Sequence, residues 1–383
     1  MSILIFIMIL LVLVLVHEFG HFFTAKKFGI RVDEFGFGFP PKLFSVKKGE
    51  TEYSINLLPL GGFVKIFGQD GENAEPVKVG PSQVCEGRTF TNLTEDSSRS
   101  FINKPKWQQA IVLFAGIFAN FLLAWILFSF SFMSGLPSSV GSEPVGYKLQ
   151  DVNLVIVSVL ANSPAQNAGL KTGDKITHLR SNNDSVTDIN PDTLKSFVVS
   201  HRNQEIEIGY TRGLIKNINF TKMISVASVT DDGKPMIGIS MDMIGIAKLP
   251  FFTAFLEGFK FNWSMTKGTA MGLYTFISES IRGKGSFTAV TGPVGMVGIV
   301  GDAYQFGFVY LLSFTALISI NLAIINLIPF PALDGGRLFF LLIEKIKGSR
   351  INPKVANTAN MIGFFLLIFL MIVITYHDVV KLF

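Results

Sequence analysis

Near the N-terminus, His17-Glu18-Phe19-Gly20-His21 matches the pattern H-E-x-x-H. In a helix, residues four positions apart share a face and lie about 6 Å apart along the axis, so the two imidazoles point to the same side. Two such histidines can bind one Zn²⁺, and the glutamate between them reaches the water on the metal. The motif therefore predicts a zinc site with His17 and His21 as ligands and Glu18 as the general base.

The motif lies in an apolar stretch, residues 3–23. The alternative is a pair of satisfied polar residues in a helix bundle, but ionisable groups at membrane depth are costly and are usually functional. His17 follows Ile3 by 14 residues, which is about 21 Å of helix in a hydrocarbon core of about 30 Å. The site is therefore expected inside the membrane, past its midpoint.

Zinc needs a third protein ligand and an open position for water. The other histidines are poor candidates, because His178 and His201 fall in a predicted external domain and His377 lies at the outer end of the last apolar segment. Asp334 directly follows the third apolar segment, in the stretch Asn326-Leu-Ile-Pro-Phe-Pro-Ala-Leu-Asp-Gly-Gly336. Its two prolines break the helix, which is tolerated at membrane depth only where backbone lines a cavity or is buried in protein. Asp334 is the preferred third ligand, with a turn or N-cap aspartate as the alternative.

The composition indicates where such a site belongs. The chain has 383 residues, of which 49% are hydrophobic and 16% charged, and its mean hydropathy is +0.45. Soluble proteins carry about 25% charged residues, so a wholly soluble enzyme is excluded. The single cysteine, Cys85, cannot form an intramolecular disulfide, and a net charge of +5 is too mild to indicate nucleic acid. The composition predicts a multi-pass membrane protein with a sizeable soluble part.

Four segments are long and apolar enough to span a bilayer, which takes about 20 residues. They are residues 3–23, 111–133, 308–328 and 356–376. The first is not a typical signal peptide, because it lacks a positive n-region and a small-residue cleavage site.

Basic residues near the segment ends predict the orientation. They cluster after the first segment, before the second and after the third. The N-terminus and residues 134–305 are therefore expected outside, and residues 24–106 and 337–355 inside. This places the H-E-x-x-H motif near the cytoplasmic face.

The remaining stretches differ in pattern. Residues 31–66 alternate Gly, Phe and polar residues, which predicts strands and turns at the inner membrane face. Residues 145–240 show strand-like runs and one short helix, typical of a small soluble domain. Residues 250–281 mix aromatic and charged residues, which favours an amphipathic interfacial helix.

The chain resembles the site-2 protease family of intramembrane zinc metalloproteases (peptidase family M50), in the bacterial branch of the regulator of sigma-E protease type, which carries an external PDZ domain. The resemblance covers nearly the whole chain. It rests on the H-E-x-x-H motif and on four further stretches: Pro59-Leu-Gly-Gly-Phe-Val-Lys65, Ala119-Asn120-Phe121, Gly292-Pro-Val-Gly295 and the stretch from Asn326 to Gly335. One departure is Ile117, where relatives usually carry a proline after the glycine.

The resemblance implies that His17, His21 and Asp334 bind zinc and that Glu18 is the general base. It also implies that Asn321 and Asn326 lie near bound substrate, although either could merely hydrogen-bond the broken backbone. Residues 163–176 resemble the core of a PDZ domain, which usually binds C-termini or extended segments by adding a strand.

The expected fold is a multi-pass α-helical membrane protein with about four transmembrane helices, an inserted α+β PDZ domain and a membrane-associated β-strand region. The expected division is 1–30, first transmembrane helix with the motif; 31–106, cytoplasmic-face β region and loop; 107–134, second helix; 145–240, extracytoplasmic PDZ domain; 246–305, interfacial amphipathic region; 306–340, third transmembrane segment; and 356–380, fourth helix.

The expected activity is that of a zinc-dependent endopeptidase of the bacterial inner membrane, with the N-terminus and PDZ domain outside and the active site near the cytoplasmic face. Its partners would be single-span membrane proteins, the lipid bilayer and a peptide or C-terminus bound by the PDZ domain, with no nucleic acid. Relatives release anti-sigma factors or clear remnant signal peptides, and nothing in the residues chooses between these. Two alternatives are a catalytically silent scaffold or receptor acting through its PDZ domain, and a different zincin with a glutamate as third ligand.

Overall fold

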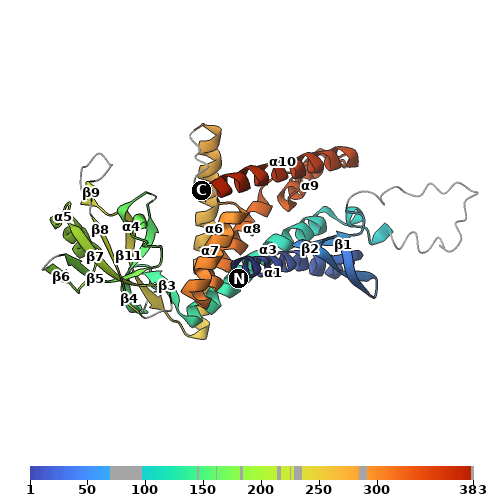
Figure 1. The fold of residues 1–383 in the computed structure, drawn as a ribbon. Coiled ribbons are helices and arrows are strands. Elements are labelled where there is room, and N and C mark those ends of the chain that lie inside the picture. The colour runs from blue at the N-terminus through green and yellow to red at the C-terminus, as the bar shows by residue number, and fades with distance from the viewer. Residues whose placement is uncertain are drawn as a thin grey trace, which may run out of the picture. The chain divides into compact units, whose positions relative to one another are not determined.

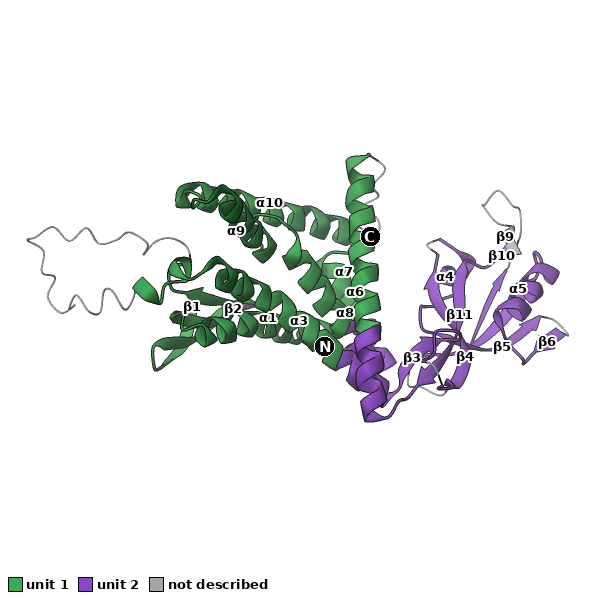
Figure 2. Cartoon of the chain, turned by 180° about the vertical axis from the view of Figure 1, so that it is seen from behind, with its two compact units in different colours: residues 1–126, 261–300, 315–383 green, residues 127–260, 301–314 purple. Residues whose placement is uncertain are grey.

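The computed structural model describes residues 1–69, 97–144, 146–160, 162–181, 184–213, 217–224, 226–227, 235–283 and 291–380. The chain divides into two compact units, shown in two colours in Figure 2. Unit 1 comprises residues 1–126, 261–300 and 315–383, and unit 2 comprises residues 127–260 and 301–314. Each unit is described by itself.

Helices dominate unit 1 (Figure 1). The described helices that lie wholly or partly in unit 1 are α1 Ser2–Lys27, α3 Lys106–Ser134, α6 Phe251–Ile281, α7 Pro293–Phe306, α8 Phe308–Leu327, α9 Asp334–Lys347 and α10 Pro353–Val380, with the short 3₁₀ helix η1 at Phe101–Asn103. Part of α3, α6, α7 and α8 belongs to unit 2. Helices α7 and α10 begin at prolines, which suit a first helical position because the missing N–H has no partner there. Helix α9 ends at Gly348, whose φ of 73° is the left-handed conformation that glycine adopts without strain.

Four of the described helices, α1, α3, α8 and α10, are long and apolar enough to cross a membrane. Each covers one of the four segments expected from the sequence, apart from the last residue of the third. In α10 only 6% of the most apolar window is buried within the protein, so its apolar side chains are available to lipid. Helix α6 is not among the four, and the expectation that residues 246–305 lie at the membrane interface stays a prediction.

Strands β1 (Val32–Lys48) and β2 (Thr51–Ile66) form the sheet of unit 1. Both strands bend, so that four segments lie side by side. Residues 42–48 pair with 51–56 in opposite directions, residues 34–37 pair with 52–55 in the same direction, and residues 32–37 pair with 62–66 in opposite directions. Among the described residues, the two outer segments, 42–48 and 62–66, therefore leave one edge each without a strand partner.

Unit 2 contains an α+β domain built on one antiparallel sheet with the strand order β3-β11-β4-β5-β7-β8, in which β6 also pairs with β5. The strands are β3 Leu136–Ser139, β4 Gln150–Val159, β5 Lys175–Ser181, β6 Asp184–Val186, β7 Glu205–Thr211, β8 Asn219–Ile224 and β11 Ile239–Ala247; a second pair consists of β9 Val226–Ala227 and β10 Pro235–Met236. The described part of the domain has two helices, α4 Pro164–Asn167 and α5 Pro191–Ser200, where the sequence suggested one.

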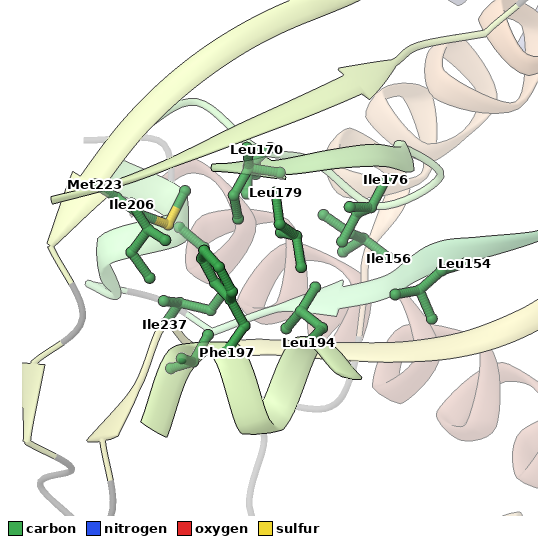
Figure 3. Packing of buried hydrophobic residues seen from close by; sticks show 13 residues of the cluster. Leu154, Ile156, Leu170, Ile176, Leu179, Leu194, Phe197, Ile206, Met223 and Ile237 are labelled. Carbon is green, nitrogen blue, oxygen red and sulfur yellow. The ribbon is translucent and has the colours of Figure 1, made fainter. Parts of the chain in front are cut away.

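The core of this domain lies between the sheet and α5. Leu194 and Phe197 of α5 point toward Ile156, Leu179 and the other buried aliphatic residues of the strands (Figure 3). Asn190 caps α5 by accepting hydrogen bonds from the backbone N–H groups at 192 and 193, so the helix begins at a fixed point against the sheet.

Candidate metal centre

His17 and His21 lie one turn apart on α1, and both side chains are buried. Their Nε2 atoms are 3.2 Å apart, and the rings meet edge to face with centroids 4.8 Å apart. Oδ2 of Asp334 lies 2.9 Å from Nε2 of His17 and 3.2 Å from Nε2 of His21. The three residues that the sequence analysis selected therefore point at one another, although His17 and Asp334 are 317 positions apart in the chain.

Asp334 reaches this position because a tight loop leads into α9. Ala332 has a φ of +77°, a left-handed conformation that costs a residue with a Cβ about 1 kcal/mol or more. A Cβ at Gly335 or Gly336 would lie 2.3 or 2.2 Å from the carbonyl oxygens of Ile328 and Phe330, so only glycine lets the chain fold back on itself here. The loop thus turns the first residue of α9 toward the histidines.

Helix α10 supports the same loop. The backbone N–H of Ala332 donates to Oδ1 of Asn360, at 3.2 Å. A Cβ at Gly363 would lie 2.5 Å from the carbonyl oxygen of Pro331, so α10 approaches the loop as closely as backbone allows. The third candidate ligand is therefore positioned by the last helix of the chain.

The donor set fits zinc. Zinc bonds to histidine nitrogen and carboxylate oxygen are about 2.0–2.2 Å long, so the ligand atoms of a tetrahedral site lie about 3.3 Å apart. The three atoms of His17, His21 and Asp334 are separated by 2.9, 3.2 and 3.2 Å. Two imidazoles and one carboxylate leave the fourth position open, as in catalytic rather than structural sites.

Helix α3 contributes the surroundings of both histidines. Nδ1 of His21 lies 2.8 Å from the carbonyl oxygen of Val112, and Nδ1 of His17 lies 3.2 Å from Nδ2 of Asn120. Gly116 lies between them, and a Cβ there would be 2.3 Å from Nε2 of His21. Small residues also let the two helices approach each other, since a Cβ at Gly20 would be 2.4 Å from the carbonyl oxygen of Ala115.

The three candidate ligands open onto a cavity of about 290 Å³. Glu18 and Asn326 line it, together with Arg337 of α9. The outer segment of the β1–β2 sheet forms part of its wall through Phe63, Val64 and Ile66. Asn321 is not among the residues that line this cavity, so the structure brings Asn326 but not Asn321 to the site.

The sequence analysis did not single out the contact residues of α3 as part of the site. Val112 acts through its backbone, which no side-chain pattern reveals. Gly116 and Asn120 follow it at intervals of four, the spacing of a helix face. That spacing was the available signal, but it indicates a shared face without saying what lies against it.

The family model of peptidase family M50 matches residues 5–370 of the chain. A Clostridium perfringens protein named as a zinc metalloprotease is 34% identical over 369 residues, covering 96% of this chain and 95% of that protein. The regulator of sigma-W protease RasP of Bacillus subtilis is 33% identical, with coverages of 99% and 98%. The zinc metalloprotease RasP of Bacillus licheniformis is 32% identical, also with 99% and 98%.

Among solved structures, the PDZ domain of the SdrC-like protein of Listeria monocytogenes matches 25% of this chain and 93% of its own, at 21% identity and a TM-score of 0.20.

Proposed function

The chain belongs to peptidase family M50 and is a zinc-dependent metalloendopeptidase of a bacterial membrane, and we propose that it hydrolyses peptide bonds within or beside the transmembrane segments of single-span membrane proteins. The observation that carries the proposal is the meeting of His17, His21 and Asp334 beside Glu18, on a helix apolar enough to span a bilayer. A hydrolytic site on a helix of this kind suits substrates that themselves lie in the membrane.

In the proposed mechanism, His17, His21 and Asp334 hold the metal. Bound zinc supplies a Lewis acid that polarises the scissile carbonyl and activates water near neutral pH. Glu18 follows His17 in the chain and lines the same cavity, so its carboxylate is placed to accept the proton of the attacking water and to pass it to the leaving amine. Asn326, in the cavity wall, is placed to hydrogen-bond the substrate backbone.

A peptide bond inside a helix is shielded by its own hydrogen bonds, so the substrate has to unwind before it is cut. We assign this step to the sheet edge formed by residues 62–66. This edge has no strand partner among the described residues, and three of its residues line the cavity of the metal centre. An unwound substrate segment can pair with it as an added strand and so lie across the site.

Peptide binding is also proposed for the α+β domain of unit 2, as a PDZ domain. A cavity of about 620 Å³ runs between α5 and the start of β11, lined mainly by apolar residues that include Leu194, Val198 and Met241. Such a groove suits an apolar C-terminus or an extended segment. The domain then either captures a substrate tail or excludes substrates with large external domains. Deleting residues 150–230 separates the two: loss of all cleavage favours capture, and cleavage of untrimmed substrates favours exclusion.

The test of the proposed activity compares the wild type with Glu18→Gln on a single-span membrane substrate, with the zinc content of both measured. We expect Glu18→Gln to keep its zinc and to lose cleavage, because the amide cannot accept the proton. Equal cleavage by the two proteins would refute the protease mechanism. His17→Ala is the companion variant, and it should lose both zinc and cleavage.

A further inference from the structure

Asn120 of α3 is completely buried, and its side chain contacts His17 of the metal centre. Its Nδ2 atom lies 3.2 Å from Nδ1 of His17, while its Oδ1 atom is buried without a hydrogen-bond partner among the described residues. A buried amide oxygen without a partner costs about 1–3 kcal/mol. The amide therefore needs an explanation.

The chemistry of His17 supplies one. Its Nε2 atom faces Asp334 and His21, and Nε2 would supply the lone pair to a zinc ion bound between them. A neutral imidazole then carries its hydrogen on Nδ1, which needs an acceptor rather than a second donor. His21 already has one, because its Nδ1 lies 2.8 Å from the carbonyl oxygen of Val112.

Turning the amide of Asn120 by half a turn would give Oδ1 a donor and Nδ1–H of His17 an acceptor, and would place Nδ2 where Oδ1 has no partner among the described residues. The oxygen and nitrogen of an amide have nearly the same shape and are assigned from their hydrogen bonds. With the two exchanged, Oδ1 accepts from Nδ1–H of His17, and the buried oxygen has its partner. The main chain of Asn120 is fixed independently, because its carbonyl oxygen accepts from Oγ of Ser319 on α8 at 2.8 Å.

We propose that Asn120 is a positioning residue of the metal centre, and that its side-chain oxygen accepts a hydrogen bond from Nδ1 of His17 and so holds the ring in the tautomer and orientation that bind zinc. Helix α3 supplies no ligand, yet through Val112 and Asn120 it orients both histidines of the motif. The inference rests on the proposed role of His17 as a ligand. It adds a contact that the H-E-x-x-H pattern does not contain.

The test measures zinc affinity by competition with a chromophoric chelator, and the visible spectrum of the Co²⁺-substituted protein, using the purified full chain. Asn120→Leu keeps the volume and removes the acceptor, so we expect zinc affinity to fall about 10–100-fold, the usual cost of losing an outer hydrogen bond to a ligand. Asn120→Asp keeps an acceptor oxygen and no donor, so we expect zinc affinity and the Co²⁺ spectrum close to those of the wild type.

Asn262 of α6 provides the matched control. It is equally buried, its Nδ2 donates to the carbonyl oxygen of Phe121 on α3, and its Oδ1 also lacks a described partner. Asn262→Leu therefore removes a similar buried amide at another contact of α3, away from the candidate ligands, and should leave zinc affinity unchanged.

Two results would overturn the inference. Asn120→Leu with the affinity of the wild type would show that His17 needs no acceptor there, and Asn120→Asp as weak as Asn120→Leu would show that the amide presents its nitrogen. Neither result touches the proposed activity, which fails instead if His17→Ala keeps its zinc.

Discussion

Gly116 offers the most direct check of how tightly α3 holds the two histidines. A Cβ at this position would lie 2.3 Å from Nε2 of His21 and 2.9 Å from Cε1 of His17, whereas ordinary contact begins near 3.4 Å. Gly116→Ala therefore pushes the ring of His21 by about 1 Å, and metal bonds tolerate only about 0.2 Å. A shift of the His21 ring also disturbs Asp334, because Nε2 of His17, Nε2 of His21 and Oδ2 of Asp334 lie within 3.2 Å of one another.

We expect Gly116→Ala to weaken zinc binding by about 100-fold, or about 3 kcal/mol. The same substitution should lower the free energy of unfolding of the metal-free protein by about 1–3 kcal/mol, as is usual for one extra methyl group in a filled interior. Zinc affinity is measured against a chelator and stability by thermal unfolding of the metal-free protein in detergent.

Gly268→Ala is the control. Gly268 lies in α6, and a Cβ there would meet nothing within 4 Å, so the same substitution should leave zinc binding unchanged and slightly strengthen the helix. Wild-type zinc affinity and cleavage in Gly116→Ala would refute the reasoning, because they would mean that the rings are free to move away from α3.

Three further predictions follow from other parts of the protein. Asp334→Ala should lose zinc and cleavage together, and a chelator should abolish wild-type cleavage until zinc is restored; zinc retained in Asp334→Ala would point to another ligand. Val64→Pro removes an N–H from the outer segment 62–66 and should slow cleavage about five- to tenfold, the equivalent of one hydrogen bond, at unchanged zinc content. Val46→Pro, in the opposite outer segment, should not slow cleavage, and equal rates for the two variants would exclude strand addition at residues 62–66. Burial favours the neutral form of Glu50, but hydrogen bonds from Lys26 and Arg99 outweigh burial and lower the pKa of Glu50. This contact therefore stabilises the fold at neutral pH, and its contribution is lost as pH falls through the lowered pKa. Glu50→Gln should reduce stability by less than about 1 kcal/mol at pH 7, measured by thermal unfolding, and the difference from the wild type should vanish in acid.

The metal centre could be predicted from the sequence to the extent that its ligands stand in a recognisable pattern. His17 and His21 are related by helix geometry, which the spacing reports directly. Asp334 follows the third apolar segment, so the predicted orientation of the segments brings it to the level of the motif. The choice of Asp334 rested on its place after the third apolar segment, and the family resemblance supported it. The structure adds the reason that the loop can turn, namely Gly335 and Gly336 against backbone oxygens.

Other features depend on packing between elements far apart in the chain, which spacing does not report. The stretch 31–66 was recognisable as strands, but the bend that places 34–37 beside 52–55 in the same direction was not, so the sequence did not show which segments lie at the edges of the sheet. Residues 51–56 lie inside the sheet, between 42–48 and 34–37, whereas residues 62–66 form an edge. Likewise, Asn120 could be seen as part of a motif, but its contact with His17 depends on how α1 and α3 pack.

Because α10 supports the loop before Asp334, the metal centre depends on residues that are synthesised late. His17 leaves the ribosome early, but its partner comes 317 residues later, and the loop that aims this partner is fixed by Asn360 and Gly363 later still. At about 5–20 residues per second, synthesis takes on the order of 15–60 s to pass from one ligand to the other. During that time the growing chain carries two of the three candidate ligands, His17 and His21. The third candidate ligand and the helix that supports its loop are therefore the last parts of the metal centre to be made.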